Sequence, residues 1–157
     1  WDGEDMAEAF AMGARGVQMG TRFAATVEGD ASDRFKQAYV DANEGDVVLI
    51  KSPCGLPGRA IRSPFVERYL GEMLDKASCS VGCLSHCVCR IKHETFCIAD
   101  ALVKAYRGDW ENGLFFCGSN VGKVKSVVSV GGLMKELVDG CLEAMGRASQ
   151  KNLTNRA

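Results

Sequence analysis

An apolar run that stops at a glycine and a threonine constrains the fold more than any other part of this chain. Residues 13–23 read GARGVQMGTRF, and the apolar centre VQM leads directly into Gly20-Thr21. We interpret residues 16–20 as a short strand between two helical patterns. Backbone N–H groups left free at the end of such a strand, beside a helix N-terminus, suit a phosphate group. A buried strand that turns at a glycine is the other interpretation, and short glycine motifs alone do not separate the two.

Periodicity along the rest of the chain predicts helices separated by short strands. Asp2 is a candidate N-cap and Gly13 a candidate stop for the first helix, and Pro64 fits the first turn of a later one. We expect helices over 2–12, 32–42, 64–74, 96–106 and 130–145, strands over 46–51 and 112–117, and a loop rich in proline and glycine over 52–63. The alternation indicates the α/β class. So few strands, together with the abrupt start of the helical pattern, predict the end of a larger barrel or doubly wound sheet.

Composition excludes several classes of function. The 157 residues predict one domain, and a net charge of -1 gives no basic face for nucleic acid. No apolar run reaches the roughly 18 residues of a membrane span. We find no signal segment, and therefore expect a cytoplasmic protein that binds neither nucleic acid nor membrane.

Eight cysteines are many for a chain of this kind. Cys79, Cys83, Cys87 and Cys97 provide four thiols, and such sets suit a tetrahedral zinc ion or an iron–sulfur cluster. The spacing of the first pair is longer than is usual for zinc, so packed thiols or disulfides stay open as alternatives. Cys141 falls on the apolar stripe Leu133, Leu137, Cys141 and Met145 of the last predicted helix.

Several separated motifs together resemble the nitronate monooxygenase family, formerly called 2-nitropropane dioxygenases. GARGVQMGTRF is similar to the eighth-strand motif of this family, which flavin-dependent enoyl-ACP reductases share. In family order there follow DRFKQAY at 33–39, KSPCGLPGRAI at 51–61 and GLFFCGSN at 113–120. Short matches at 97–99 and 128–130 resemble a cysteine-rich branch. The resemblance covers about residues 1–140 and only the C-terminal part of such an enzyme.

The resemblance implies the C-terminal portion of a TIM (β/α)₈ barrel with a helical, cysteine-rich extension. Residues 1–64 would form the last strand region with its flanking helices and loop, and residues 65–157 the extension of the same domain. FMN would lie at the C-terminal ends of the strands, where such barrels hold their ligands. The residues implied in FMN binding are Gln18, Met19, Gly20 and Thr21, and the loop implied to close toward the flavin or substrate is Gly118, Ser119 and Asn120.

The implied activity is oxidation of alkyl nitronates, small-molecule substrates, with dioxygen as the flavin oxidant. The family's histidine base has no counterpart here, since His86 and His93 do not match its position. We therefore expect the catalytic base to lie upstream of these residues and this chain alone to be inactive. Arg22 either neutralises phosphate charge or is a solvated surface residue. A flavin-dependent enoyl-ACP reductase and a non-enzymatic, metal-stabilised cysteine module are the alternatives, and a homodimer is expected.

Overall fold

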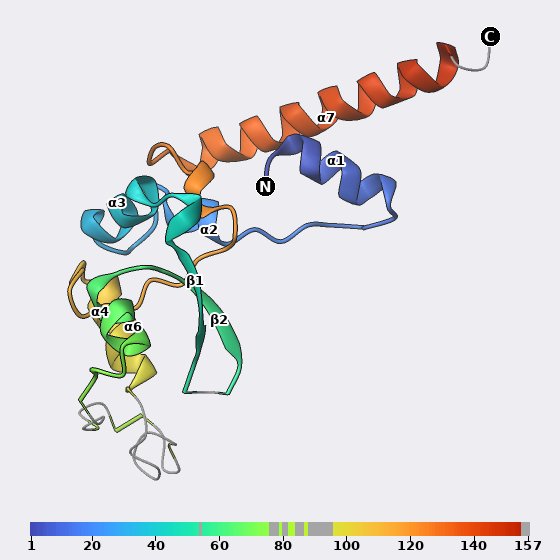
Figure 1. Cartoon of the computed structure of the whole chain (residues 1–157). Coiled ribbons are helices and arrows are strands. Elements are labelled where there is room, and N and C mark those ends of the chain that lie inside the picture. Colours follow the sequence, from blue (N-terminus) through green and yellow to red (C-terminus); the bar gives the residue numbers. More distant parts are fainter. Residues whose placement is uncertain (54, 76–78, 80–81, 84–86, 88–95, 155–157) are drawn as a thin grey trace.

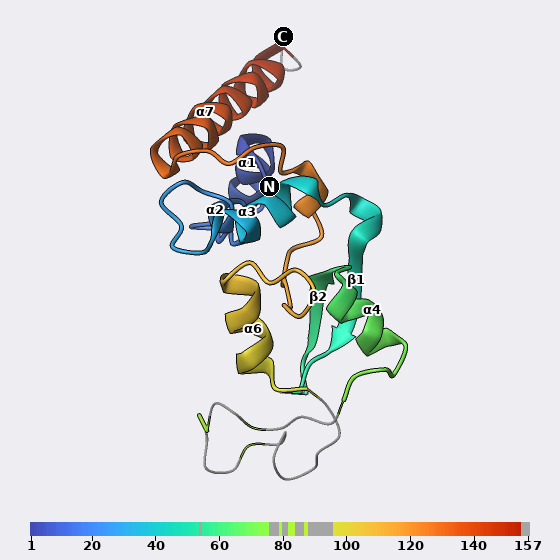
Figure 2. The same cartoon turned by 90° about the vertical axis from the view of Figure 1, so that its left-hand side faces the viewer.

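The computed structural model describes residues 1–53, 55–75, 79, 82, 83, 87 and 96–154, without the side chains of residues 151–154. A long C-terminal helix crosses the first helix at one end of the molecule (Figure 1). A β-hairpin runs through the middle, and two further helices flank it at the other end (Figure 2). None of the described helices is long and apolar enough to cross a membrane.

The elements follow one another in a helix-rich order. The α-helices are α1 (Gly3–Ala11), α2 (Thr21–Ala24), α3 (Asp33–Asp41), α4 (Pro64–Leu70), α6 (Ile98–Tyr106) and α7 (Val130–Thr154). The strands are β1 (Val47–Lys51) and β2 (Pro57–Ile61), and the 3₁₀ turns are η1 (Glu44–Asp46) and η2 (Val121–Lys123).

Side-chain caps explain why the predicted helices begin where they do. The Asp2 carboxylate accepts a hydrogen bond from the Asp5 N–H at 3.0 Å, and the Ser32 hydroxyl opens α3 in the same way. Ser63 caps α4, whose first residue is the proline expected there. These helix starts are confirmed, although α4 ends at Leu70 instead of reaching residue 74. Glu72 just beyond it has a φ of 56°, which is incompatible with a continuing helix.

The loop predicted over 52–63 is wrong, because its second half is strand β2. β1 and β2 form an antiparallel hairpin in which Val47 pairs with Ile61 and Lys51 with Pro57. Proline is tolerated here because it is the first residue of its strand. The β1 strand is also less buried than expected: Ile50 is buried, but Leu49 is 65% exposed. One face of the hairpin packs on the protein and the other does not.

The strand predicted over 16–20 is also wrong. This segment runs as irregular chain after α1 (Figure 1), and its residues other than Met19 are exposed. A strand needs a hydrogen-bonded neighbour, and none of the described segments pairs with it. The segment predicted as a strand over 112–117 forms a single bridge, between Phe116 and Ala60. It lies along β2 all the same, since the Phe115 carbonyl accepts a bond from the Ile61 N–H at 2.9 Å.

Two apolar clusters meet along this segment. Phe115 belongs to a cluster that includes Tyr39, whereas its neighbour Leu114 belongs to a second cluster that includes Phe65 and Phe96. Consecutive side chains of an extended chain point to opposite sides, so one segment serves both clusters. The rings of Phe65 and Phe96 meet edge to face with centroids 5.1 Å apart.

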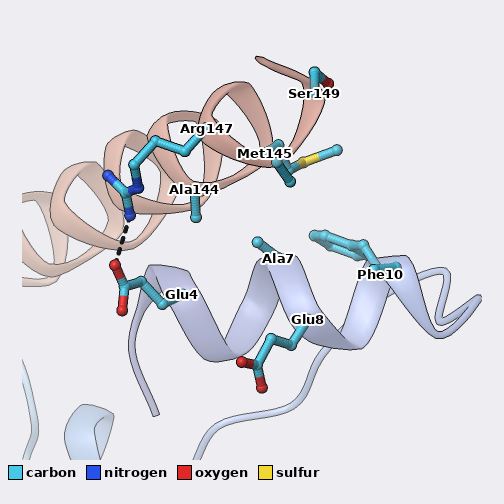
Figure 3. A pocket seen from close by; sticks show the side chains of 10 residues that line it. Glu4, Ala7, Glu8, Phe10, Ala144, Met145, Arg147 and Ser149 are labelled. Carbon is cyan, nitrogen blue, oxygen red and sulfur yellow. Dashed lines mark hydrogen bonds and ion pairs between the residues drawn. The ribbon is translucent and has the colours of Figure 1, made fainter. Parts of the chain in front are cut away.

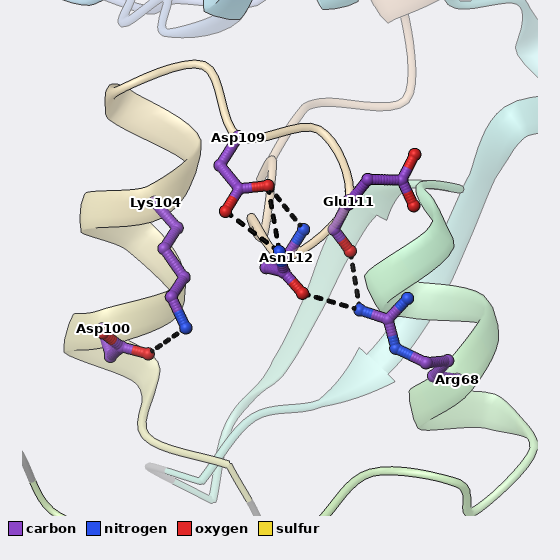
Figure 4. Close-up of polar contacts among 6 residues, drawn as sticks. All are labelled: Arg68, Asp100, Lys104, Asp109, Glu111 and Asn112. Carbon is purple, nitrogen blue, oxygen red and sulfur yellow. Dashed lines mark hydrogen bonds and ion pairs between the residues drawn. The ribbon is translucent and has the colours of Figure 1, made fainter.

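Polar contacts fix the turn before this segment (Figure 4). Arg68 of α4 donates to the Glu111 carbonyl at 2.7 Å and to the Asn112 side chain at 3.1 Å. Asp109 accepts from the Asn112 backbone N–H at 3.0 Å. α4 thereby holds the start of residues 113–120.

α7 packs on α1, and most of its predicted apolar stripe is buried. Leu133, Leu137 and Cys141 are buried as predicted. Met145 does not belong to the buried stripe, because it is 46% exposed, and the helix continues to Thr154 instead of ending near residue 145. The two helix backbones lie close together at Gly3, where an added Cβ would clash with the Cys141 nitrogen and lie 2.5 Å from the Gly140 carbonyl carbon.

Replacing Gly3 by alanine is expected to lower the free energy of unfolding by about 1–3 kcal/mol, because the methyl group would force the two helix backbones apart. Gly146, whose Cβ position is open, is the matched control within α7. Alanine there should raise stability by about 0.5–1 kcal/mol through helix propensity. Urea denaturation followed by circular dichroism measures both, and equal effects of the two substitutions would contradict the close helix contact.

Candidate functional site

One pocket brings together the two segments singled out in the sequence. Its lining residues are Trp1, Gln18, Met19, Gly20, Thr21, Arg22, Gly118, Ser119 and Asn120, around a volume of about 160 Å³. Residues 18–20 lead into α2, which begins at Thr21, and the loop 118–120 follows the extended segment between the two apolar clusters. All seven residues named from the sequence as flavin or loop contacts therefore lie in one place.

A hydrogen bond joins the two segments. The Thr21 hydroxyl oxygen accepts from the Gly118 backbone N–H at 2.8 Å. Since a hydroxyl also carries one donor, the Thr21 proton can be donated elsewhere. A Cβ at Gly118 would lie 3.1 Å from this oxygen, so glycine permits the close approach.

The pocket also contains the start of α2. Gly20 is the residue before the helix and gives no side-chain cap to it. The first N–H groups of a helix have no partner inside the helix. Because α2 has only four residues, its individual N–H groups, at Thr21 and the residues after it, would contribute more to binding an anion than a helix dipole would.

Arg22 is neither solvated nor available as a free charge. Its two terminal nitrogens donate to the two carboxylate oxygens of Glu136 in α7, at 2.8 and 2.9 Å. The Arg22 side chain is 15% exposed, so the expectation of a solvated arginine is wrong. The hydrogen bond from Arg22 holds the pKa of the Glu136 carboxyl below its usual range. The sequence gives no local signal of this pair, because its members are 114 residues apart.

Comparison with known proteins shows the family of this chain. The sequence model described as nitronate monooxygenase matches residues 1–140. The chain belongs to the nitronate monooxygenase family. A probable nitronate monooxygenase of Staphylococcus aureus (strain Newman) is 34% identical over 77 residues, which are 47% of this chain and 22% of the relative.

Solved structures share the α/β fold. The structure of FabK from Thermotoga maritima superposes with a TM-score of 0.74 and 30% identity, over 96% of this chain and 44% of that chain. A mutant of the same FabK gives a TM-score of 0.71 and 28% identity, over 96% of this chain and 42% of that one. The chain thus spans less than half the length of these FabK chains and about a fifth of the matched curated relative.

The two residues before the loop 118–120, Phe116 and Cys117, are associated with uncharged polar groups. The buried Tyr39 hydroxyl donates to the Phe116 carbonyl at 2.6 Å, and burial raises the pKa of this tyrosine. Burial also raises the pKa of the Cys117 thiol to about 11. At neutral pH Cys117 is therefore a protonated, half-buried thiol, in keeping with a packing role.

The cysteine cluster predicted as a metal site is not assembled. Cys79, Cys83, Cys87 and Cys97 are all among the described residues, which contain no group of three or more histidine, cysteine or acidic side chains able to hold a metal ion. Cys97 is buried at the start of α6, whereas Cys83 is exposed. The structure thus gives no support to zinc or an iron–sulfur cluster. His86 and His93 lie outside the described residues.

A larger cavity of about 520 Å³ lies between α1 and α7 (Figure 3) and was not anticipated from the sequence. Small side chains from both helices, such as Ala7 of α1 and Ala144 of α7, form much of its lining. These small residues are the sequence signal from which the cavity could have been predicted. Its opposite charges Glu4 and Arg147 bond to each other. The pocket of Thr21 and Gly118 instead has several side chains with hydrogen-bond donors in its lining.

Proposed function

We propose that this pocket binds the phosphate of FMN, and that the protein is a flavin-dependent oxidoreductase that oxidises alkyl nitronates with dioxygen. The observation that supports it most is the bond between Thr21 and Gly118. It joins the two segments that the family resemblance associates with the flavin, and leaves a hydroxyl proton to donate.

The chemistry of the pocket fits a phosphate. None of the described residues that line it is an aspartate or glutamate, so no carboxylate among them would repel an anion. Gln18, Thr21, Ser119 and Asn120 carry side-chain donors, and Gly20 and Thr21 add backbone N–H groups. Because Glu136 compensates the charge of Arg22, hydrogen bonds rather than a free cation would hold the phosphate.

When bound, FMN supplies the redox chemistry, and the residues of this chain bind and orient it. In a (β/α)₈ barrel the segment 16–20 would lie at the last strand, with the pocket at its C-terminal end. A flavin-dependent enoyl-ACP reductase would use the same pocket, so the substrate distinguishes the two activities. The homodimer and the cytoplasmic location stay predictions.

Titration with FMN and with riboflavin tests the phosphate site, because riboflavin lacks only the phosphate. We expect FMN to bind at least about tenfold more tightly, which corresponds to about 1.4 kcal/mol. Equal affinities would contradict a phosphate site in this pocket. Oxygen uptake with an alkyl nitronate, compared with turnover of an enoyl thioester, then separates the two activities in an FMN-loaded protein that also contains the upstream segments with the expected catalytic base.

A further inference from the structure

A second set of contacts involves Arg22 and Trp1, which line the pocket together with Gly118. The Arg22 guanidinium lies over the ring of Trp1, 5.2 Å from its centroid, while both its terminal nitrogens bond to Glu136. Bidentate binding fixes the plane of a guanidinium as well as its position. Arg22 therefore links α7 to the Trp1 ring.

Trp1 is a wall residue of the pocket. Its side chain is 11% exposed, packs against the cluster that contains Phe115, and lines the pocket together with Gly20 and Thr21. An apolar ring beside hydrogen-bond donors excludes water and strengthens their bonds to an anion. The same ring would be partly covered by whatever the donors bind.

We propose that Trp1 directly contacts the phosphate compound bound in this pocket and that Glu136 is a positioning residue, which acts through Arg22. The inference rests on the proposed function, since it concerns the same pocket. It assigns Arg22 to shaping the wall rather than to binding the anion. Loss of the Glu136 carboxylate leaves the guanidinium without its partner and frees the Trp1 ring to move.

Trp1 fluorescence tests the proposal directly. The chain has two tryptophans, and Trp110→Phe leaves Trp1 as the single emitter. Inorganic phosphate is the probe, because it does not absorb the emission as a flavin would. We expect phosphate, but not chloride at equal ionic strength, to lower the acrylamide quenching constant of Trp1 by about half as the ring is covered.

Glu136→Gln in the same background is expected to raise the quenching constant at least about twofold without phosphate and to abolish the protection by phosphate. Glu67→Gln is the matched control, because Glu67 bonds to Arg62 at the same 2.8 Å but lies outside the pocket. This control should behave like the parent protein. Thermal unfolding of both variants shows whether each remains folded.

The outcomes separate this inference from the proposed function. If FMN binds more tightly than riboflavin but phosphate leaves Trp1 quenching unchanged, the contact with Trp1 is refuted and the flavin site stands. If Glu136→Gln leaves Trp1 quenching as in the parent, the positioning role is refuted. Failure of FMN to bind refutes the proposed function, and the inference with it.

Discussion

Replacing Thr21 by valine is expected to weaken FMN binding at least about tenfold. Valine keeps the branched shape but removes the oxygen that accepts from the Gly118 N–H at 2.8 Å and the proton available to a phosphate. A hydrogen bond to a charged group contributes about 1.5–3 kcal/mol, which is tenfold or more in affinity. Titration followed by flavin fluorescence measures the change.

Ser129→Ala is the matched control for this substitution. The Ser129 hydroxyl also accepts a backbone N–H, that of Gly132 at 3.1 Å, but it lies at the start of α7 and outside the pocket. FMN affinity should be unchanged in this variant. Riboflavin affinity should be nearly the same in Thr21→Val and in the parent protein. A Thr21 variant that loses riboflavin and FMN affinity equally would show that the hydroxyl does not act on the phosphate.

Replacing Phe115 by alanine is expected to lower the free energy of unfolding by about 3–5 kcal/mol. The ring is completely buried between Phe35 and Trp110, with centroid distances of 5.6 and 5.2 Å. Its removal leaves a cavity at the centre of one cluster. Urea denaturation followed by circular dichroism gives the loss.

The neighbouring Phe116 provides the control for this prediction. Its side chain is partly buried and packs at the margin of the second cluster, while its carbonyl accepts the Tyr39 bond through the backbone. Phe116→Ala should therefore lower the free energy of unfolding clearly less than Phe115→Ala does. Equal losses, or a loss below about 1 kcal/mol at Phe115, would contradict the central position of this ring.

Local signals in the sequence were sufficient for the starts of several helices, but not for α2 or for the ends of α4 and α7. Asp2 and Ser32 cap the helices they precede, and Pro64 begins α4, because capping depends on residues within one turn. β2 was missed because Pro57-Gly58 is typical of a loop. Only pairing with β1 shows that the proline occupies the first position of a strand, where its missing N–H is tolerated.

Contacts between residues far apart in the chain leave no pattern in the sequence comparable to these local capping signals. The family resemblance identified both segments of the pocket, but the Thr21–Gly118 bond that joins them is visible only in the structure. The same holds for Arg22, whose partner Glu136 lies on a distant helix. Residues 16–20 have a strand-like composition, yet composition cannot supply the neighbouring strand that a ladder needs.

Amide chemical shifts on addition of FMN provide the most direct test of the phosphate site. If the pocket binds the phosphate, the largest changes will fall on Gly20, Thr21, Gly118 and Asn120, and riboflavin will leave these amides nearly unchanged. Largest changes at residues of the cavity between α1 and α7, such as Ala7 and Ala144, would place the flavin elsewhere and contradict the proposed site.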